Sequence, residues 1–195
     1  MRSFGSHGPG EECGPSAVAL RGRAFPEGVA MKKLMLPACV AGLAFTGIAA
    51  VPAAAEERSC RGSIGAVTVD NLRVPQGATC TLNGTRVKGT VKVERAATLH
   101  ASKIRVVGSV QAENHKQVNI SGSAVGGSIQ VKQGGGSSLS TNTVNGDVQY
   151  FTNRGTITIR SNRIDGNLQC KENQPAPTGG GNVVQGNKED QCRRL

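Results

Sequence analysis

Hydrophobic and small residues recur along this chain with a fixed period. Apolar residues occupy alternate positions around a recurring glycine, and polar residues fall between them. Alternation of this kind predicts β-strands with one buried face, and a fixed period predicts a solenoid whose turns bury their apolar faces against one another. The glycine returns every 19 or 20 residues, at Gly89, Gly108, Gly127, Gly146, Gly166 and Gly186.

The expected inward positions form rows with one residue from each repeat. The row two residues before the glycine is Val87, Val106, Val125, Val144, Ile164 and Val184. The row two residues after it is Val91, Val110, Ile129, Val148 and Leu168. Between the inward rows, we expect a row to face water: Lys92, Gln111, Gln130, Gln149 and Gln169. Four residues before their glycines stand Asn142, Asn162 and Asn182, and we expect these amides to stack and to bond to one another.

Period and pattern together predict an all-β protein. The fold class is a right-handed, single-stranded parallel β-helix of about five to six rungs, with two strands and two bends per rung. Helical repeats are longer, leucine-rich repeats carry a motif that is missing here, and a left-handed hexapeptide helix advances by multiples of six. At the glycine row, either the missing side chain makes room for larger neighbours or the chain bends with positive φ. We favour the bend.

The N-terminal part of the chain resembles a targeting segment. Met31-Lys32-Lys33 precedes an apolar run from Leu34 to Val51, and Ala53-Ala54-Ala55 closes it. A positive start, an apolar middle and a small-residue exit are typical of a signal peptide, here 31–55; a transmembrane helix is the alternative. We therefore expect 1–30 to be a disordered upstream extension. The mature chain, cleaved near Ala55 and without a transmembrane segment, would be secreted or periplasmic.

The mature chain divides into an N-terminal cap (56–78), the β-helix (79–170), and a C-terminal loop and cap (171–195). It holds four cysteines, and an even number in an exported chain predicts two disulfides. Of the three possible pairings we favour Cys60–Cys80 and Cys170–Cys192, which tie each end to the nearest full turn. Each closes a loop of about 20 residues, worth roughly 3 kcal/mol in the chain-entropy model.

Three stretches resemble those of known proteins: Asn71–Leu82, Gly166–Cys170 and Gly186–Cys192. They look like small exported bacterial β-helix proteins of unassigned activity, and the resemblance, which covers most of 60–192, implies the same fold. A weaker resemblance is to bactofilins, and it implies polymerisation through the ends of the β-helix. The signal peptide and the end cysteines argue against that implication.

Charge adds a candidate binding face. The mature chain has 18 Lys and Arg against 10 Asp and Glu, a surplus that favours anionic partners. Arg86 and Arg105 share one register on adjacent rungs, Arg163 follows three rungs later, and Lys88 and Lys92 lie nearby in sequence. This pattern predicts a basic face for an anionic polysaccharide or the cell envelope; scattered solvated charges are the alternative. Nucleic acid is disfavoured, because exposed aromatic residues for base stacking are nearly absent.

A second constellation has the oxygen ligands that calcium prefers. Asn145, Asp147, Asp165 and Asn167 flank two glycines on adjacent rungs, and calcium is the only cofactor that we consider. Turn formation by Asn and Asp beside a glycine is the alternative. We expect no other pair of carboxylates to align on neighbouring rungs.

Catalysis has little support in the sequence. The mature chain has two histidines, His100 and His115; we expect the first in an outward row and the second in a surface loop. No catalytic residue is assigned. The leading hypothesis is a non-enzymatic protein that binds an anionic polymer. The alternatives are a carbohydrate-active enzyme, lyase-like or hydrolase-like, at the Asp147 and Asp165 region, or a module that stacks end to end. The oligomeric state stays open.

Overall fold

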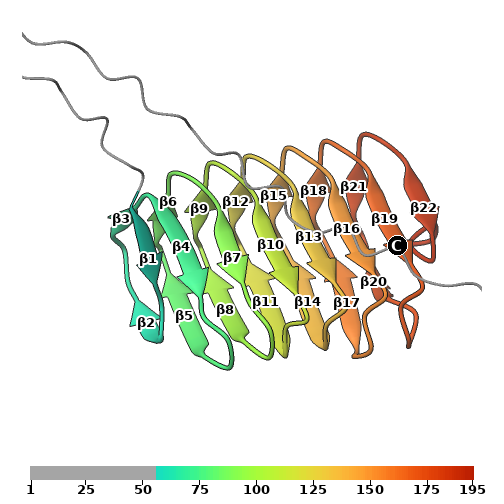
Figure 1. Cartoon of the computed structure of the whole chain (residues 1–195). Coiled ribbons are helices and arrows are strands. Elements are labelled where there is room, and N and C mark those ends of the chain that lie inside the picture. The colour runs from blue at the N-terminus through green and yellow to red at the C-terminus, as the bar shows by residue number, and fades with distance from the viewer. Residues whose placement is uncertain (1–55) are drawn as a thin grey trace, which may run out of the picture. The chain divides into compact units, whose positions relative to one another are not determined.

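The structure is a computed structural model that describes residues 56–195. The expected upstream extension (1–30) and signal peptide (31–55) lie outside the described residues. The described part is a parallel β-solenoid without helices, in which each strand pairs in parallel with the equivalent strand of the next turn (Figure 1). This confirms the all-β solenoid predicted from the period.

Each full turn contributes one strand to each of three sheets, called A, B and C here. Sheet A contains β1 (Glu57–Ser59), β4 (Asn71–Val74), β7 (Val91–Val93), β10 (Val110–Glu113), β13 (Ile129–Lys132), β16 (Val148–Phe151), β19 (Leu168–Lys171) and β22 (Lys188–Asp190). Sheet B contains β2 (Gly62–Ile64), β5 (Thr79–Asn83), β8 (Thr98–Ser102), β11 (Gln117–Ser121), β14 (Gly136–Ser140), β17 (Ile157–Arg160) and β20 (Thr178–Gly180). Sheet C contains β3 (Thr68–Val69), β6 (Arg86–Val87), β9 (Arg105–Val106), β12 (Ala124–Val125), β15 (Thr143–Val144), β18 (Arg163–Ile164) and β21 (Val183–Val184).

Two details of the expected β-helix are wrong. There are about seven turns rather than five to six, because segments expected as caps fold as rungs: 56–78 contains β1 to β4, and 171–195 contains β20 to β22. Each turn has three strands rather than two. The strands of sheet C are only two residues long, too short for an alternating pattern to separate them from a bend.

The inward rows form the core as predicted. From Val87 to Ile164 and from Val91 to Leu168, every member of the two rows beside the glycines is almost fully buried. The polar row on sheet A is exposed or half-buried, and Gln149 Nε2 donates to Gln169 Oε1 at 2.9 Å. The side chains therefore alternate inward and outward along the strands of sheet A.

The glycine row bends the chain between sheets C and A, as favoured, but without positive φ. From Gly108 onward, each glycine N–H instead donates to the carbonyl of the glycine one turn before, for example Gly108 to Gly89 at 3.0 Å and Gly127 to Gly108 at 2.9 Å. A Cβ on Gly108 would lie 2.6 Å from the carbonyl oxygen of Gly89. Glycine is required here because backbones of successive turns approach closely, not because of an unusual φ.

Asparagine ladders line the other two corners. At the corner between sheets B and C, Asn142 Nδ2 donates to Asn162 Oδ1 at 3.0 Å, and Asn162 Nδ2 donates to Asn182 Oδ1 at 2.9 Å, which confirms the predicted stack. A second ladder, which the sequence analysis missed, runs from Asn153 through Asn173 to Gln191 at the corner between sheets A and B. The residue before each of the Asn in these ladders, except Asn182, is a non-glycine residue with left-handed φ: Thr141, Ser161, Thr152 and Glu172.

Both ends of the solenoid are cross-linked. Cys60 is joined to Cys80 and Cys170 to Cys192, with Cα–Cα distances of 5.6 and 5.2 Å. These are the two pairs that the sequence analysis favours. Each bond connects a terminal segment to the adjacent turn, so both ends of the column are held covalently.

His115 contradicts the expectation of a solvated side chain. Its side chain is only 3% exposed, and its ring lies against Gly134, where an added Cβ would overlap it. His115 and Gly134 precede Asn153 at steps of 19 residues, in the register of the second ladder. Desolvation lowers the pKa of His115 to about 4, although a backbone contact with Gly136 opposes the shift.

Gly108→Ala should destabilise the protein by about 1–3 kcal/mol, because its Cβ has no room beside the Gly89 carbonyl. Gly65→Ala is the matched control, since a Cβ there meets nothing within 4 Å. Urea unfolding followed by circular dichroism measures both. Equal losses in the two variants would show that close packing of the glycine row does not limit stability.

The protein should lose stability as the pH falls from about 6.5 to about 4, the ordinary and the folded pKa of His115. In this window the unfolded chain binds a proton at this residue and the folded chain does not, which costs roughly 3 kcal/mol at the acid end. In His115→Asn the loss should be smaller by this amount, whereas His100→Asn should follow the wild type. Urea midpoints measured across the window would refute the assignment if both variants behaved alike.

Candidate functional site

Two arginines stand side by side on the outer face of sheet C. Arg86 on β6 and Arg105 on β9 are paired residues of neighbouring parallel strands, and both are exposed. Neighbouring strands lie about 4.8 Å apart. The two guanidinium groups therefore project from the same face, one turn apart, as the shared register predicts.

An open hollow adjoins this arginine pair. It encloses ≈ 340 Å³, at the lower end of the size range of ligand sites. It exists because β12 and the residue that follows it bear small groups: Ala124 pairs with Arg105, and Gly126 is so close to the Val107 carbonyl that a Cβ would overlap it. Its lining includes Arg86, Arg105, Val107, Ala124, Gly126 and Asn145, and we call it the sheet C hollow.

The sheet C hollow is positively charged. No carboxylate lines it, and among residues 56–195 neither Arg86 nor Arg105 forms an ion pair with Asp or Glu. Guanidinium groups present flat, forked donors that match carboxylate, sulfate or phosphate oxygens. The hollow therefore suits an anionic group that belongs to a molecule too large for a closed pocket.

The other three candidates for the basic face do not line this hollow. Lys88 pairs with Asp70 at 2.9 Å, and Arg163, three strands from Arg105, lies 3.8 Å from Asp165. Lys92 lies on β7 of sheet A. The structure therefore brings together two of the five predicted residues.

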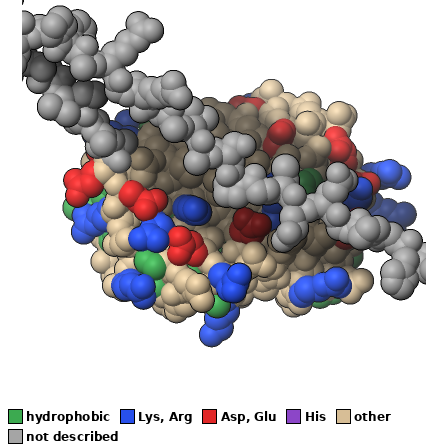
Figure 2. All heavy atoms as spheres, in the orientation of Figure 1, with side chains coloured by type: hydrophobic (Ala, Val, Ile, Leu, Met, Phe, Trp, Pro, Cys, Tyr) green, Lys and Arg blue, Asp and Glu red, His purple; other side chains and the backbone are tan. Residues whose placement is uncertain are grey.

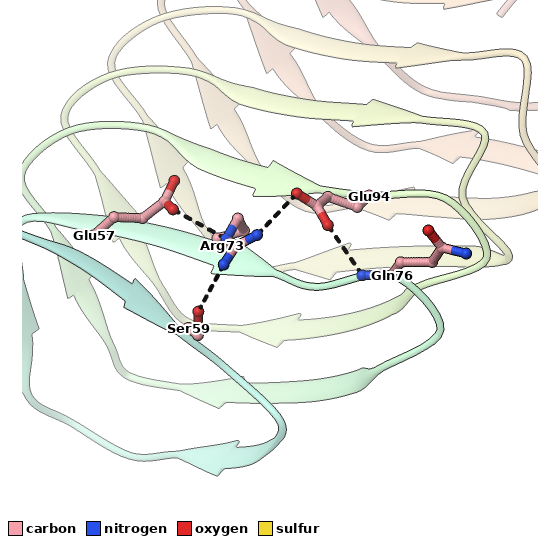
Figure 3. A network of polar contacts seen from close by, with 5 residues as sticks. All are labelled: Glu57, Ser59, Arg73, Gln76 and Glu94. Carbon is pink, nitrogen blue, oxygen red and sulfur yellow. Dashed lines mark hydrogen bonds and ion pairs between the residues drawn. The ribbon is translucent and has the colours of Figure 1, made fainter.

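Sheet A carries charges of both signs. In Figure 2, Lys and Arg side chains alternate with Asp and Glu side chains over the N-terminal part of the visible face. Figure 3 shows one source of this mixture: Arg73 forms ion pairs with Glu57 at 3.0 Å and Glu94 at 3.3 Å, and Glu94 also accepts from the Gln76 N–H at 3.0 Å. These contacts connect β1, β4 and the residue after β7, and they compensate the charge of Arg73.

A pair of carboxylates that the sequence analysis did not expect also lies here. Glu94 directly follows β7, and Glu113 is the last residue of β10. Because β7 and β10 are paired, the two glutamates share a register on neighbouring turns. Both line an open hollow with Lys92 and Arg95. Desolvation raises the pKa of Glu94, but the hydrogen bonds from Arg73 and the Gln76 N–H outweigh it, and the net shift is downward. The register, five residues after each glycine, could have revealed this pair.

Three of the four calcium candidates use a side-chain oxygen to accept a hydrogen bond from the protein. Asp147 Oδ1 accepts from the Asn167 N–H and Asn167 Oδ1 from the Asn187 N–H, both at 2.8 Å. Asp165 Oδ1 accepts from Gln185 Nε2 at 2.9 Å, and Asn145 lines the sheet C hollow. Within 56–195 there is no cluster of three or more His, Cys, Asp or Glu that could hold a metal ion.

The same backbone contact occurs on earlier turns. Ser109 Oγ accepts from the Ser128 N–H, and Ser128 Oγ accepts from the Asp147 N–H, both at 3.1 Å. After the four corner glycines from Gly108 to Gly166, the next residue thus caps the backbone of the following turn with a side-chain oxygen. This arrangement corresponds to the turn-forming role that the sequence analysis gave as the alternative to calcium.

No family model matches the chain, and no curated protein or solved structure matches it either. In the part of the chain that the structure describes, no helix is long and apolar enough to cross a membrane. The fold itself defines the class of protein, a disulfide-bonded parallel β-solenoid with three sheets.

Asp147→Ala should cost about 1 kcal/mol, because it leaves the half-buried Asn167 N–H without its acceptor. Asp165→Ala removes an exposed carboxylate and should change stability by less than about 0.5 kcal/mol. Thermal unfolding in calcium and in EDTA measures both. Stabilisation of the wild type by calcium that both variants abolish would instead establish a metal site.

Proposed function

We propose that this protein is an exported, non-enzymatic β-solenoid that binds an acidic polysaccharide of an envelope or matrix through the outer face of sheet C. The observation that carries the proposal is the arginine pair, Arg86 and Arg105, beside an open hollow without carboxylates. Two uncompensated guanidinium groups one turn apart favour a ligand that presents several anionic groups.

A polymer fits this face better than a small anion. The hollow is open, and the outer face of sheet C continues beyond it past β15 to Arg163 on β18. The surplus of eight positive charges on 56–195 attracts a polyanion over a longer range than any single contact. A chain lying along the solenoid axis would meet the arginine pair first and Arg163 about 14 Å further on.

Export rests on the signal-like pattern of 31–55 and on the two disulfides, which persist in oxidising compartments. The likeness to small exported bacterial β-helix proteins supports the same location.

The alternatives have less support. A carbohydrate-active enzyme built on Glu94 and Glu113 would need one carboxyl group held protonated as the acid, but the pKa of Glu94 is lowered. End-to-end stacking would add strands at the edges of all three sheets. The two edge strands of sheet A, β1 and β22, bear charged residues, Glu57 and Arg58 at one end and Lys188, Glu189 and Asp190 at the other. Charge on an edge strand opposes the addition of further strands.

The combined variant Arg86→Ala and Arg105→Ala should weaken binding to alginate, polygalacturonate or hyaluronate by roughly tenfold or more, because each lost charge-assisted contact is worth about 1–2 kcal/mol. Lys132→Ala with Lys171→Ala, on sheet A, removes the same charge and should bind like the wild type. Isothermal titration at low and high salt measures both. Equal weakening in the two variants would show that net charge, not sheet C, determines binding, and no binding to any of the three polymers would reject the proposal.

A further inference from the structure

The outer face of sheet B differs from the other two faces in being almost uncharged. Its outward positions on seven strands carry hydroxyl, amide and imidazole groups or glycine, and Arg160 on β17 is the one charged residue among them. The central column, one residue per turn, is Ser63, Thr81, His100, Asn119, Ser138, Thr158 and Thr178. The domain as a whole has a large surplus of positive charge, so a face with almost no charged residues differs clearly from the rest of its surface.

These groups form a regular grid. Successive strands lie about 4.8 Å apart, and outward residues along one strand lie about 6.7 Å apart. A hydroxyl group both donates and accepts hydrogen bonds, and an amide group offers two donors and an acceptor. The grid therefore presents repeating donors and acceptors at spacings fixed by the backbone.

The middle of the grid is held in place by hydrogen bonds between side chains. Gln117 Nε2 donates to Asn119 Oδ1 at 2.8 Å, and Asn119 Nδ2 lies 3.1 Å from His100 Nδ1. All three side chains are half-buried, so they are fixed before any ligand arrives, which lowers the entropic cost of binding. Beside them is an open hollow of ≈ 320 Å³. Its polar lining is Thr81, Asn83, His100, Ser102, Asn119 and Ser121.

We propose that the outer face of sheet B is a second binding surface, for a neutral polysaccharide. An anionic polymer would find one cation and no further counter-charge here, and an apolar partner would have to bury the hydroxyl groups without hydrogen bonds. A neutral polymer has repeating hydroxyl groups that both donate and accept hydrogen bonds, so it can bond to the donors and acceptors of the grid. This surface is separate from the sheet C hollow and does not depend on the function proposed for it.

Ice also presents a surface of repeating hydroxyl groups and is the alternative ligand. The side chains of sheet B favour a polysaccharide over ice. The column of Thr79 and Thr98 is interrupted by Gln117 and Gly136. The central column includes an amide and an imidazole instead of one repeated side chain. Such planar groups direct hydrogen bonds toward particular sugar hydroxyls.

The test is co-sedimentation of the purified protein with cellulose, chitin and insoluble β-1,3-glucan. We expect binding to at least one of them that persists at high salt, because no charged contact is involved. Asn119→Ala with His100→Ala should weaken it roughly thirtyfold, the result of losing two groups worth about 1 kcal/mol each.

A second variant guards against misfolding. Thr81→Glu changes an exposed residue outside the Gln117–Asn119–His100 network, and it should abolish binding, since its carboxylate would lose water without gaining a partner. Gln111→Glu on sheet A adds the same charge and should leave binding intact, as should the combined Arg86 and Arg105 variant.

Three results would overturn the proposal. One is no sedimentation with any of the three polymers. Another is binding that salt abolishes or that the combined Arg86 and Arg105 variant loses, which would assign it to sheet C. The third is shaping of ice crystals by the wild type, lost in Thr81→Glu, together with no binding to polysaccharide.

Discussion

The parallel hydrogen-bond ladder between successive turns is the interaction on which this molecule depends. It makes residues 19 or 20 positions apart into neighbours and fixes which side chains lie inside. At the corners, where the backbone has no strand partner of regular geometry, other groups continue the ladder: glycine amides at one corner and asparagine amides at the other two. The corner residues are therefore specified as strictly as the core, because a buried polar group without a partner costs about 1–3 kcal/mol.

Much of the fold could be predicted from the sequence, because the repeat aligns equivalent positions of successive turns. The inward rows, the Asn142 ladder and the water-facing Gln row needed only alternation and period. Sheet C was not recognised, since two residues cannot show a period of two. The second ladder was missed because the spacing from Asn153 to Asn173 is 20 and from there to Gln191 is 18, within a segment of variable length.

The candidate site was only half predictable. The shared register of Arg86 and Arg105 is visible in the repeat, but the hollow beside them depends on Ala124 and Gly126, whose small size has meaning only once the third sheet is known. Lys92 was grouped with the arginines by proximity in sequence, yet a corner separates them. Sequence distance is a poor guide in this fold, because one turn distributes neighbouring residues over three faces. Sheet A pairs Arg73 with two glutamates, sheet C leaves two arginines free of ion pairs among the described residues, and sheet B has almost no charge.

The covalent links at both ends have a consequence for how the column comes apart. In a stack where each layer touches only its neighbours, terminal layers have half the contacts and fray first. Here Cys60–Cys80 and Cys170–Cys192 fasten those layers to the interior, so peeling from either tip is blocked. With both disulfides intact, we expect the solenoid to unfold as one cooperative unit. With the disulfides reduced, it can unfold turn by turn from its ends, and a protease would cut first in the terminal turns.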